Sequence, residues 1–209
     1  MAKKAKKKKK TTWQKHRQTI LLTGFIVLIL AIVLLVNPVT KWWQARDDIT
    51  YNSFVFRPTD GYWVTSVYVN NQPYTIPFHY NPAQVDMIPM QQEAKTLITR
   101  RPKGVFITTN PEYPSNAVVG GVEIAKVLGE RNGIFNIPTR AALTTGTGNQ
   151  TPVVTCNQAT NETIVIEIRL GLDDKIFTEG NCIIVQGATG DDLVKSSDRF
   201  VYGLLGIIG

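Results

Sequence analysis

The feature that most constrains this chain is an uncharged apolar run, ILLTGFIVLILAIVLLV, which extends from Ile20 to Val36. A helix rises about 1.5 Å per residue, so this run and its flanks can cross a hydrocarbon layer of about 30 Å. Trp42 and Trp43 follow, and tryptophan rings settle at the headgroup boundary of a membrane. We therefore predict a transmembrane signal anchor over residues 19–37, with both tryptophans at the membrane interface.

Two other interpretations of this run are weaker. A cleaved signal peptide has an apolar stretch of about 7–15 residues and a small-residue cleavage site. The present run is longer, and VNPVTKWW has no such site, although Ala45 keeps cleavage open. A buried helix of a soluble protein would usually show a polar face, which this run lacks.

The basic residues gather at the N-terminus. Nine of the 23 lysines and arginines lie before residue 19, whereas all 16 acids lie after it, so the remaining body is slightly acidic. Because Lys and Arg concentrate on the cytoplasmic side of membrane spans, residues 1–18 are predicted to form a cytoplasmic polybasic tail that contacts membrane lipid. The chain beyond the anchor then lies outside the cell, and nucleic acid could bind only through the tail.

The outer part carries features that suit an extracytoplasmic location. Cys156 and Cys182 are either two buried free thiols or a disulfide, and an oxidising compartment favours the disulfide. Without nearby histidines these cysteines supply too few ligands for zinc. Asn149 and Asn161 begin two N-x-T triplets, so both are possible glycosylation sites.

After a linker at residues 38–50, the segments SFVFRP, YWVTSVYV and PYTIPFHY are rich in aromatic and β-branched residues. They predict strands, and a tight turn at residues 69–72 joins the last two as a hairpin. Pro73 and Pro77 place the third strand at a sheet edge, because proline cannot donate to a ladder. The domain therefore begins with an antiparallel front.

A strand, a helix and a strand follow in order. GVFITTN, at residues 104–110, predicts a buried strand, and Ser115 can cap a helix over residues 116–129. Two helical turns within residues 91–98 and a short extended piece around residues 87–88 precede them. IFNIPTRAALTT resumes an extended pattern, so a crossover and a parallel strand pair are expected.

The C-terminal part predicts a strand at residues 163–170, two strands around a turn at residues 179–181, and a helix capped by Thr189 or Asp191. The apolar end LLGIIG either docks on the sheet or stays exposed. The expected fold class is α/β or α+β: an N-terminal transmembrane helix, then a mixed β-sheet domain over residues 51–209 with an antiparallel hairpin front and two main helices.

No catalytic, cofactor-binding or metal-binding residues follow from the sequence. His79 is the only histidine outside the basic tail, so a Ser/His/Asp or Cys/His mechanism would have to use it. Neither a nucleophile elbow nor a phosphate-binding glycine loop accompanies it. A lone histidine in an aromatic edge segment is usually structural.

The stretch from CNQATNETIVIEIRLGL through NCIIVQG to DDLVKSSDRFVYGLLGII resembles uncharacterised archaeal single-pass membrane-anchored extracytoplasmic proteins. FHYNPAQVDMIPM and FITTNPE are similar to their front half. The resemblance implies a Cys156–Cys182 disulfide and a domain outside an archaeal cell. It implies no activity.

These observations favour a membrane-anchored extracytoplasmic cell-envelope protein, a non-enzymatic binding or assembly module whose partner is a protein or an envelope polymer. Two alternatives stay open: an envelope enzyme with an unrecognised site, and a membrane subunit of a larger complex whose basic tail contacts a cytoplasmic partner such as RNA. Convergence of His79 with two acids in a pocket would favour the enzyme. An exposed apolar patch would favour binding.

Overall fold

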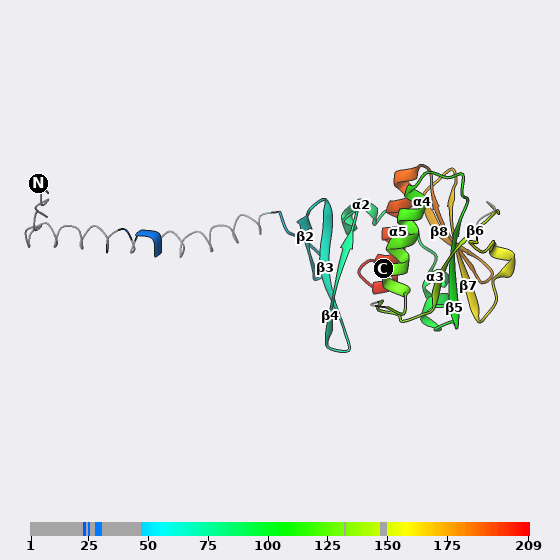
Figure 1. Ribbon diagram of the computed structural model, residues 1–209, viewed down its shortest axis with the longest axis horizontal. Helices are drawn as coiled ribbons and strands as arrows, with labels where there is room; N and C mark the ends of the chain where they lie inside the picture. The colour runs from blue at the N-terminus through cyan, green and yellow to red at the C-terminus, as the bar shows by residue number, and fades with distance from the viewer. Residues whose placement is uncertain (1–22, 24, 26–27, 31–46, 132, 147–149) are drawn as a thin grey trace, which may run out of the picture. The chain divides into compact units, whose positions relative to one another are not determined.

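A computed structural model describes residues 23, 25, 28–30, 47–131, 133–146 and 150–209 (Figure 1). The chain divides into two units, Met1–Asp47 and Asp48–Gly209. The described residues of the expected anchor are helical and exposed. Within the described part of the chain, no helix is long and apolar enough to cross a membrane. The rest of the apolar run, Trp42 and Trp43 lie outside the described residues.

The unit Asp48–Gly209 is an α+β fold with two sheets. The front sheet is antiparallel, in the order β1-β2-β3-β4. Its strands are β1 (Ile49–Tyr51), β2 (Phe54–Thr59), β3 (Tyr62–Val69) and β4 (Gln72–Phe78). The first strand thus begins two residues before the expected start of the domain. As expected from its prolines, β4 is an edge strand.

Tight turns with left-handed backbone join the front strands. Asn70 and Asn71 have φ of 51° and 63° between β3 and β4, and Asp60 and Gly61 have φ of 49° and 84° between β2 and β3. Two consecutive positive φ values define the turn whose twist matches that of paired strands, and Asn, Asp and Gly adopt it most readily. The turn expected at residues 69–72 is confirmed.

The second sheet has five strands in the order β6-β5-β7-β9-β8. All its pairs are parallel except β8 with β9. The strands are β5 (Gly104–Thr109), β6 (Thr139–Leu143), β7 (Thr163–Leu170), β8 (Lys175–Glu179) and β9 (Cys182–Gly187). The expected parallel pair around the first long helix, β5 with β6, is confirmed.

The helices are α2 (Pro82–Val85), α3 (Gln92–Thr99), α4 (Asn116–Leu128) and α5 (Gly190–Leu205), with a 3-10 turn η1 at Cys156–Gln158. Of the two expected caps of α5, Thr189 is the one used, because its hydroxyl accepts the Asp192 N–H at 3.3 Å. Ser115 precedes α4, but its side chain makes no capping hydrogen bond and its backbone is already helical. The extended piece near residues 87–88 lies instead at Met90, which bridges to β8.

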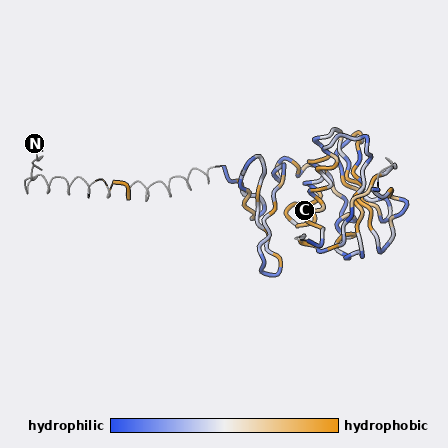
Figure 2. The backbone as a smooth tube through the Cα atoms, in the orientation of Figure 1, coloured by the Kyte–Doolittle hydropathy of each residue, from blue (hydrophilic) through white to orange (hydrophobic). Residues whose placement is uncertain are grey.

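Helices α4 and α5 form a layer that contacts both sheets, as Figure 1 shows for this unit. On the side of the front sheet, Phe78 stacks on Tyr202 of α5 at 4.1 Å between ring centroids, and Phe56 meets the same ring edge-on at 5.7 Å. On the other side, the two helices pack against apolar residues from the strands of the five-stranded sheet (Figure 2). The apolar end of α5 docks rather than staying exposed, because Ile207 and Ile208 are buried.

The close approach of the two helices requires a glycine. A Cβ atom placed on Gly120 of α4 would collide with the Ser197 hydroxyl and would lie 3.3 Å from the Leu193 carbonyl oxygen of α5. The Ser197 hydroxyl is itself buried and donates to that Leu193 oxygen at 2.8 Å. Any larger residue at position 120 therefore displaces the Ser197 side chain or pushes the helices apart.

We expect Gly120→Ala to lower the free energy of unfolding by about 1–3 kcal/mol, the usual cost of overpacking. Gly121→Ala is the matched control, because a Cβ there meets only the side-chain ends of Ile107 and Ile168, at 3.3 and 3.5 Å. Chemical denaturation of the purified variants measures both. Equal stability of the two variants would contradict this account of the helix contact.

Candidate functional site

A disulfide joins Cys156 in η1 to Cys182 in β9, as expected. It lies on the sheet face opposite α4 and α5, where Cys182, Val165 and Ile184 form a small second core. The bond closes a loop across a separation of 26 residues. Loop closure of this length stabilises a fold by about 3–4 kcal/mol in the chain-entropy description.

Glu167 of β7 lies beside this disulfide, with its Oε2 atom 3.1 Å from Cys156 Sγ. A disulfide sulfur carries no hydrogen, so this is a contact and not a hydrogen bond. Burial raises the pKa of Glu167, Arg169 partly offsets the rise, and Glu179 adds to it. This carboxylate and the two cysteines come close enough to ligate a metal, but bonded sulfurs supply no thiolate.

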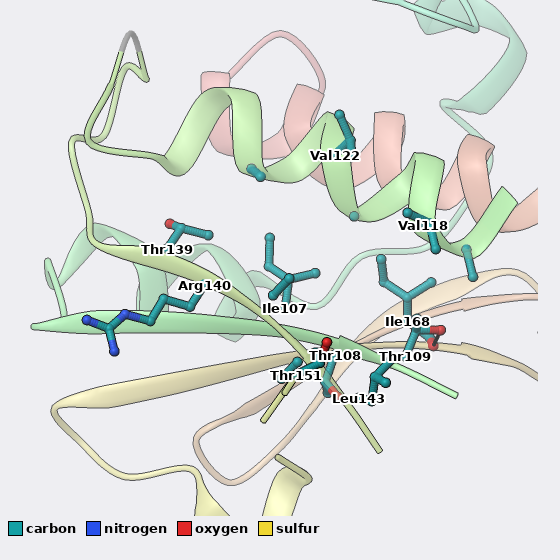
Figure 3. A pocket seen from close by; sticks show the side chains of 15 residues that line it. Ile107, Thr108, Thr109, Val118, Val122, Thr139, Arg140, Leu143, Thr151 and Ile168 are labelled. Carbon is teal, nitrogen blue, oxygen red and sulfur yellow. Dashed lines mark hydrogen bonds between the residues drawn. The ribbon is translucent and has the colours of Figure 1, made fainter. Parts of the chain in front are cut away.

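An open apolar cavity of about 310 Å³ lies between α4 and the β6 end of the five-stranded sheet (Figure 3). Val118 and Val122 of α4 line it while remaining 60% and 48% exposed. Ile107 and Ile168 point from the sheet toward α4. Ala141 of the edge strand β6 also lines the cavity. We call this cavity the α4–β6 groove.

Strand β6 forms the edge of the sheet next to this groove. Its even-numbered residues pair with β5: Val105 N–H donates to Pro138 O at 2.8 Å, and Thr144 N–H donates to Thr109 O at 3.0 Å. In a parallel ladder the residues between them turn their backbone groups to the other side. The odd-numbered residues of β6 therefore present N–H and C=O groups at the outer edge.

Only one of the outward-facing β6 residues is paired within the described part of the chain. Leu143 donates its N–H to Pro152 O and accepts from Val154 N–H, both at 2.9 Å. No described segment pairs with Thr139 or Ala141. An apolar groove thus runs beside about two residues of unused strand edge.

The second candidate site is a polar cluster at the helix layer. His79, which follows β4, meets Glu123 of α4 and Asp198 of α5, and one ligand atom of each lies within 4.8 Å of the others. The Glu123 carboxylate lies 3.5 Å from His79 Nδ1 and 2.7 Å from Lys126 Nζ. Asp198 is fully buried, Glu123 is 4% exposed, and the His79 side chain is 28% exposed.

Two atoms of this cluster have no hydrogen-bond partner in the described structure: His79 Nδ1 and Asp198 Oδ1. Leaving a buried polar atom unpaired costs about 1–3 kcal/mol. The other Asp198 oxygen accepts the Tyr80 N–H at 2.8 Å. Burial raises the pKa of Asp198 well above its usual range, the backbone amide of Tyr80 opposes this, and the Glu123 charge raises it further.

The sequence singled out His79, and the structure places it in the cluster with the two acids that the sequence could not select. The α4–β6 groove was not predicted. Asn161 is exposed in the bend before β7, whereas Asn149 lies outside the described residues. Glycosylation of both therefore stays a prediction.

Comparisons with protein-family models, with curated proteins and with solved structures gave no significant match for this sequence. Function must therefore be argued from the two sites.

We expect Asp198→Asn to change the pH dependence of stability. The native state holds a proton on Asp198 that the unfolded chain releases above a pKa near 3.8, so wild-type stability falls as pH rises toward the raised pKa. Asparagine has no such proton. The variant should therefore match the wild type near pH 4 and exceed it in stability near pH 8, measured by denaturation in metal-free buffer.

Asp192→Asn on the same helix is the control, because its effect on stability at neutral pH should have the opposite sign. Hydrogen bonds from Lys195 and Thr189 lower the pKa of Asp192, so its charge stabilises the fold above the pKa of the unfolded chain, and this contribution is lost as pH falls. This variant should lose stability at neutral pH. A pH-independent effect of Asp198→Asn would contradict the assignment.

Proposed function

We propose that this protein is a membrane-anchored extracytoplasmic binding module, which captures an extended apolar segment of a partner protein in the α4–β6 groove. The observation that carries the proposal is the juxtaposition of an open apolar cavity with the unpaired backbone edge of β6. Strand addition to a sheet edge provides affinity through backbone hydrogen bonds, and an adjoining pocket selects side chains.

The groove favours a protein over an envelope polymer. Its walls are mostly hydrocarbon from Val118, Val122, Ile107 and Ile168. Sugar hydroxyls placed against such walls would lose water without gaining partners, which costs free energy for each group. An aliphatic or aromatic side chain would gain about 25 cal/mol per Å² of apolar surface that it removes from water.

The extracytoplasmic part of the proposal is supported by the disulfide together with the basic tail and apolar run. Disulfides persist in oxidising compartments and are rare in reducing ones. The described residues within the run that are large and apolar, Phe25 and residues 28–30, are at least 45% exposed, which suits a lipid contact. The resemblance to archaeal anchored proteins suits the same location.

The enzyme alternative gains one observation, the convergence of His79 with Glu123 and Asp198. Yet neither the α4–β6 groove nor the larger cavity along the front sheet is lined by any of these three residues. General acid–base catalysis requires a substrate atom within hydrogen-bond reach of the catalytic group. The geometry therefore favours binding as the function.

We expect the two cysteines to be oxidised in the full-length protein in its own cells. Free thiols are first blocked in intact cells, and the protein is then denatured, reduced and labelled. Both cysteines should escape the block and take up the label only after reduction. A variant without residues 1–36 keeps the domain in the cytoplasm and should be labelled before reduction. Free thiols in the full-length protein, or a disulfide in both forms, would contradict the assigned compartment.

We expect a photo-crosslinking amino acid at Val118 to capture a discrete partner protein in intact cells. Val122→Asp should reduce the yield about tenfold or more, since a loss of about 1.4 kcal/mol already gives that factor. Ala141→Pro should also reduce it, because it removes the outward N–H of β6 while leaving the ladder to β5 intact. Mass spectrometry of the adduct identifies the partner.

Leu172→Asp is the matched control, because Leu172 is 99% exposed and does not line the groove. This variant should retain the adduct. An adduct made of two copies of this chain, an adduct of carbohydrate only, or a yield unchanged by Val122→Asp would each overturn the proposal.

A further inference from the structure

Three potential metal ligands converge from three separate elements of the described structure. His79 lies directly after β4, Glu123 lies on α4 and Asp198 lies on α5, and their ligand atoms are all within 4.8 Å of one another. The two helices are held against each other at Gly120, so the separation of the carboxylates is set by backbone packing. The cluster does not belong to the α4–β6 groove.

The cluster atoms that lack a hydrogen bond are those a metal ion would use. Asp198 Oδ1 and His79 Nδ1 are buried without a hydrogen-bond partner in the described structure. Tyr80 N–H holds the other Asp198 oxygen, which orients the carboxylate and leaves Oδ1 for a further interaction. A hydrogen bond to the atom of a ligand that does not touch the ion orients that ligand in a metal site.

The charges that face the cluster suit a divalent cation. Glu123 and Asp198 bring two acids into the helix layer. Among the residues that the structure describes, Lys126 is the one cationic side chain besides His79 that forms an ion pair with them. The Lys126 side chain is 39% exposed, so it can turn to solvent when a cation replaces it. His79, whose side chain is 28% exposed, is the ligand nearest to solvent.

The ligand set identifies the kind of metal. Calcium and magnesium prefer oxygen ligands only, whereas one imidazole with two carboxylates suits zinc, which binds His nitrogen and Asp or Glu oxygen. We propose that His79, Glu123 and Asp198 bind one Zn²⁺ ion, which links the end of β4 to both helices of the middle layer. With three protein ligands, such a Zn²⁺ ion takes water as its fourth ligand.

The test uses the full chain, oxidised and purified in detergent. After treatment with a chelator, ZnCl₂ is titrated by calorimetry, and the thermal midpoint is measured with and without zinc. One Zn²⁺ should bind per chain and raise the midpoint. MgCl₂ at equal concentration should leave the midpoint unchanged.

Four variants separate this site from zinc bound elsewhere on the chain. Asp198→Asn and His79→Ala should each weaken zinc binding by about 100-fold or more, since changing a residue that only hydrogen-bonds to a ligand already costs about 10–100-fold in affinity. His79→Ala is included because His79 is the more exposed of the two residues and its replacement disturbs the fold less. Asp192→Asn, a like substitution on the same helix, should bind zinc as the wild type does. Lys126→Met should bind at least as tightly, because it removes the competing cation.

The proposal is overturned if zinc leaves the wild-type midpoint unchanged, or if Asp198→Asn and His79→Ala bind as the wild type does. Loss of zinc binding in Lys126→Met would also overturn it, because the lysine would then support the site and not compete with the ion. These outcomes are independent of the crosslinking result at Val118, so either proposal can fail alone.

Discussion

The contact between α4 and α5 at Gly120 is the constraint on which the rest of the domain depends. Because this glycine lets the helix backbones approach closely, the pair forms one layer that meets the front sheet through Tyr202 and the five-stranded sheet on its other side. The same contact produces the polar cluster. Glu123 lies about one helical turn after Gly120, and Asp198 directly follows Ser197. The contact between Gly120 and Ser197 therefore also brings the two carboxylates together.

Most secondary structure of the described domain could be predicted, because each element carries its own local signal. Alternating isoleucines in Thr163–Leu170 predicted β7, and the proline content of β4 predicted an edge strand. The cysteine pair was expected on compartment grounds. His79 was noticed only because the outer part of the chain has no other histidine.

The division into two sheets and the make-up of the cluster could not be predicted, because they depend on contacts between distant elements. Ser196–Arg199 is polar, and one-sided packing of α5 would leave such residues in water. They are nonetheless buried, because the two sheets, helix α4 and the chain end around Gly209 enclose α5. Glu123 and Lys126 have the three-residue spacing of a surface ion pair, yet Glu123 is buried. The groove was missed because it is defined by the absence of a described helix over β6, which no local pattern encodes.

The disulfide and the groove are linked through one short segment. Cys156 is bonded to Cys182, and two residues earlier Val154 pairs with Leu143 of β6 and accepts the Thr108 hydroxyl at 2.8 Å. This segment pairs with the outer edge of β6 at Leu143, and Thr151 at its start lines the groove. A reduced chain would lose the covalent restraint on that segment, and the edge that receives a partner strand would lose its fixed end. An oxidising compartment would therefore serve recognition as well as stability.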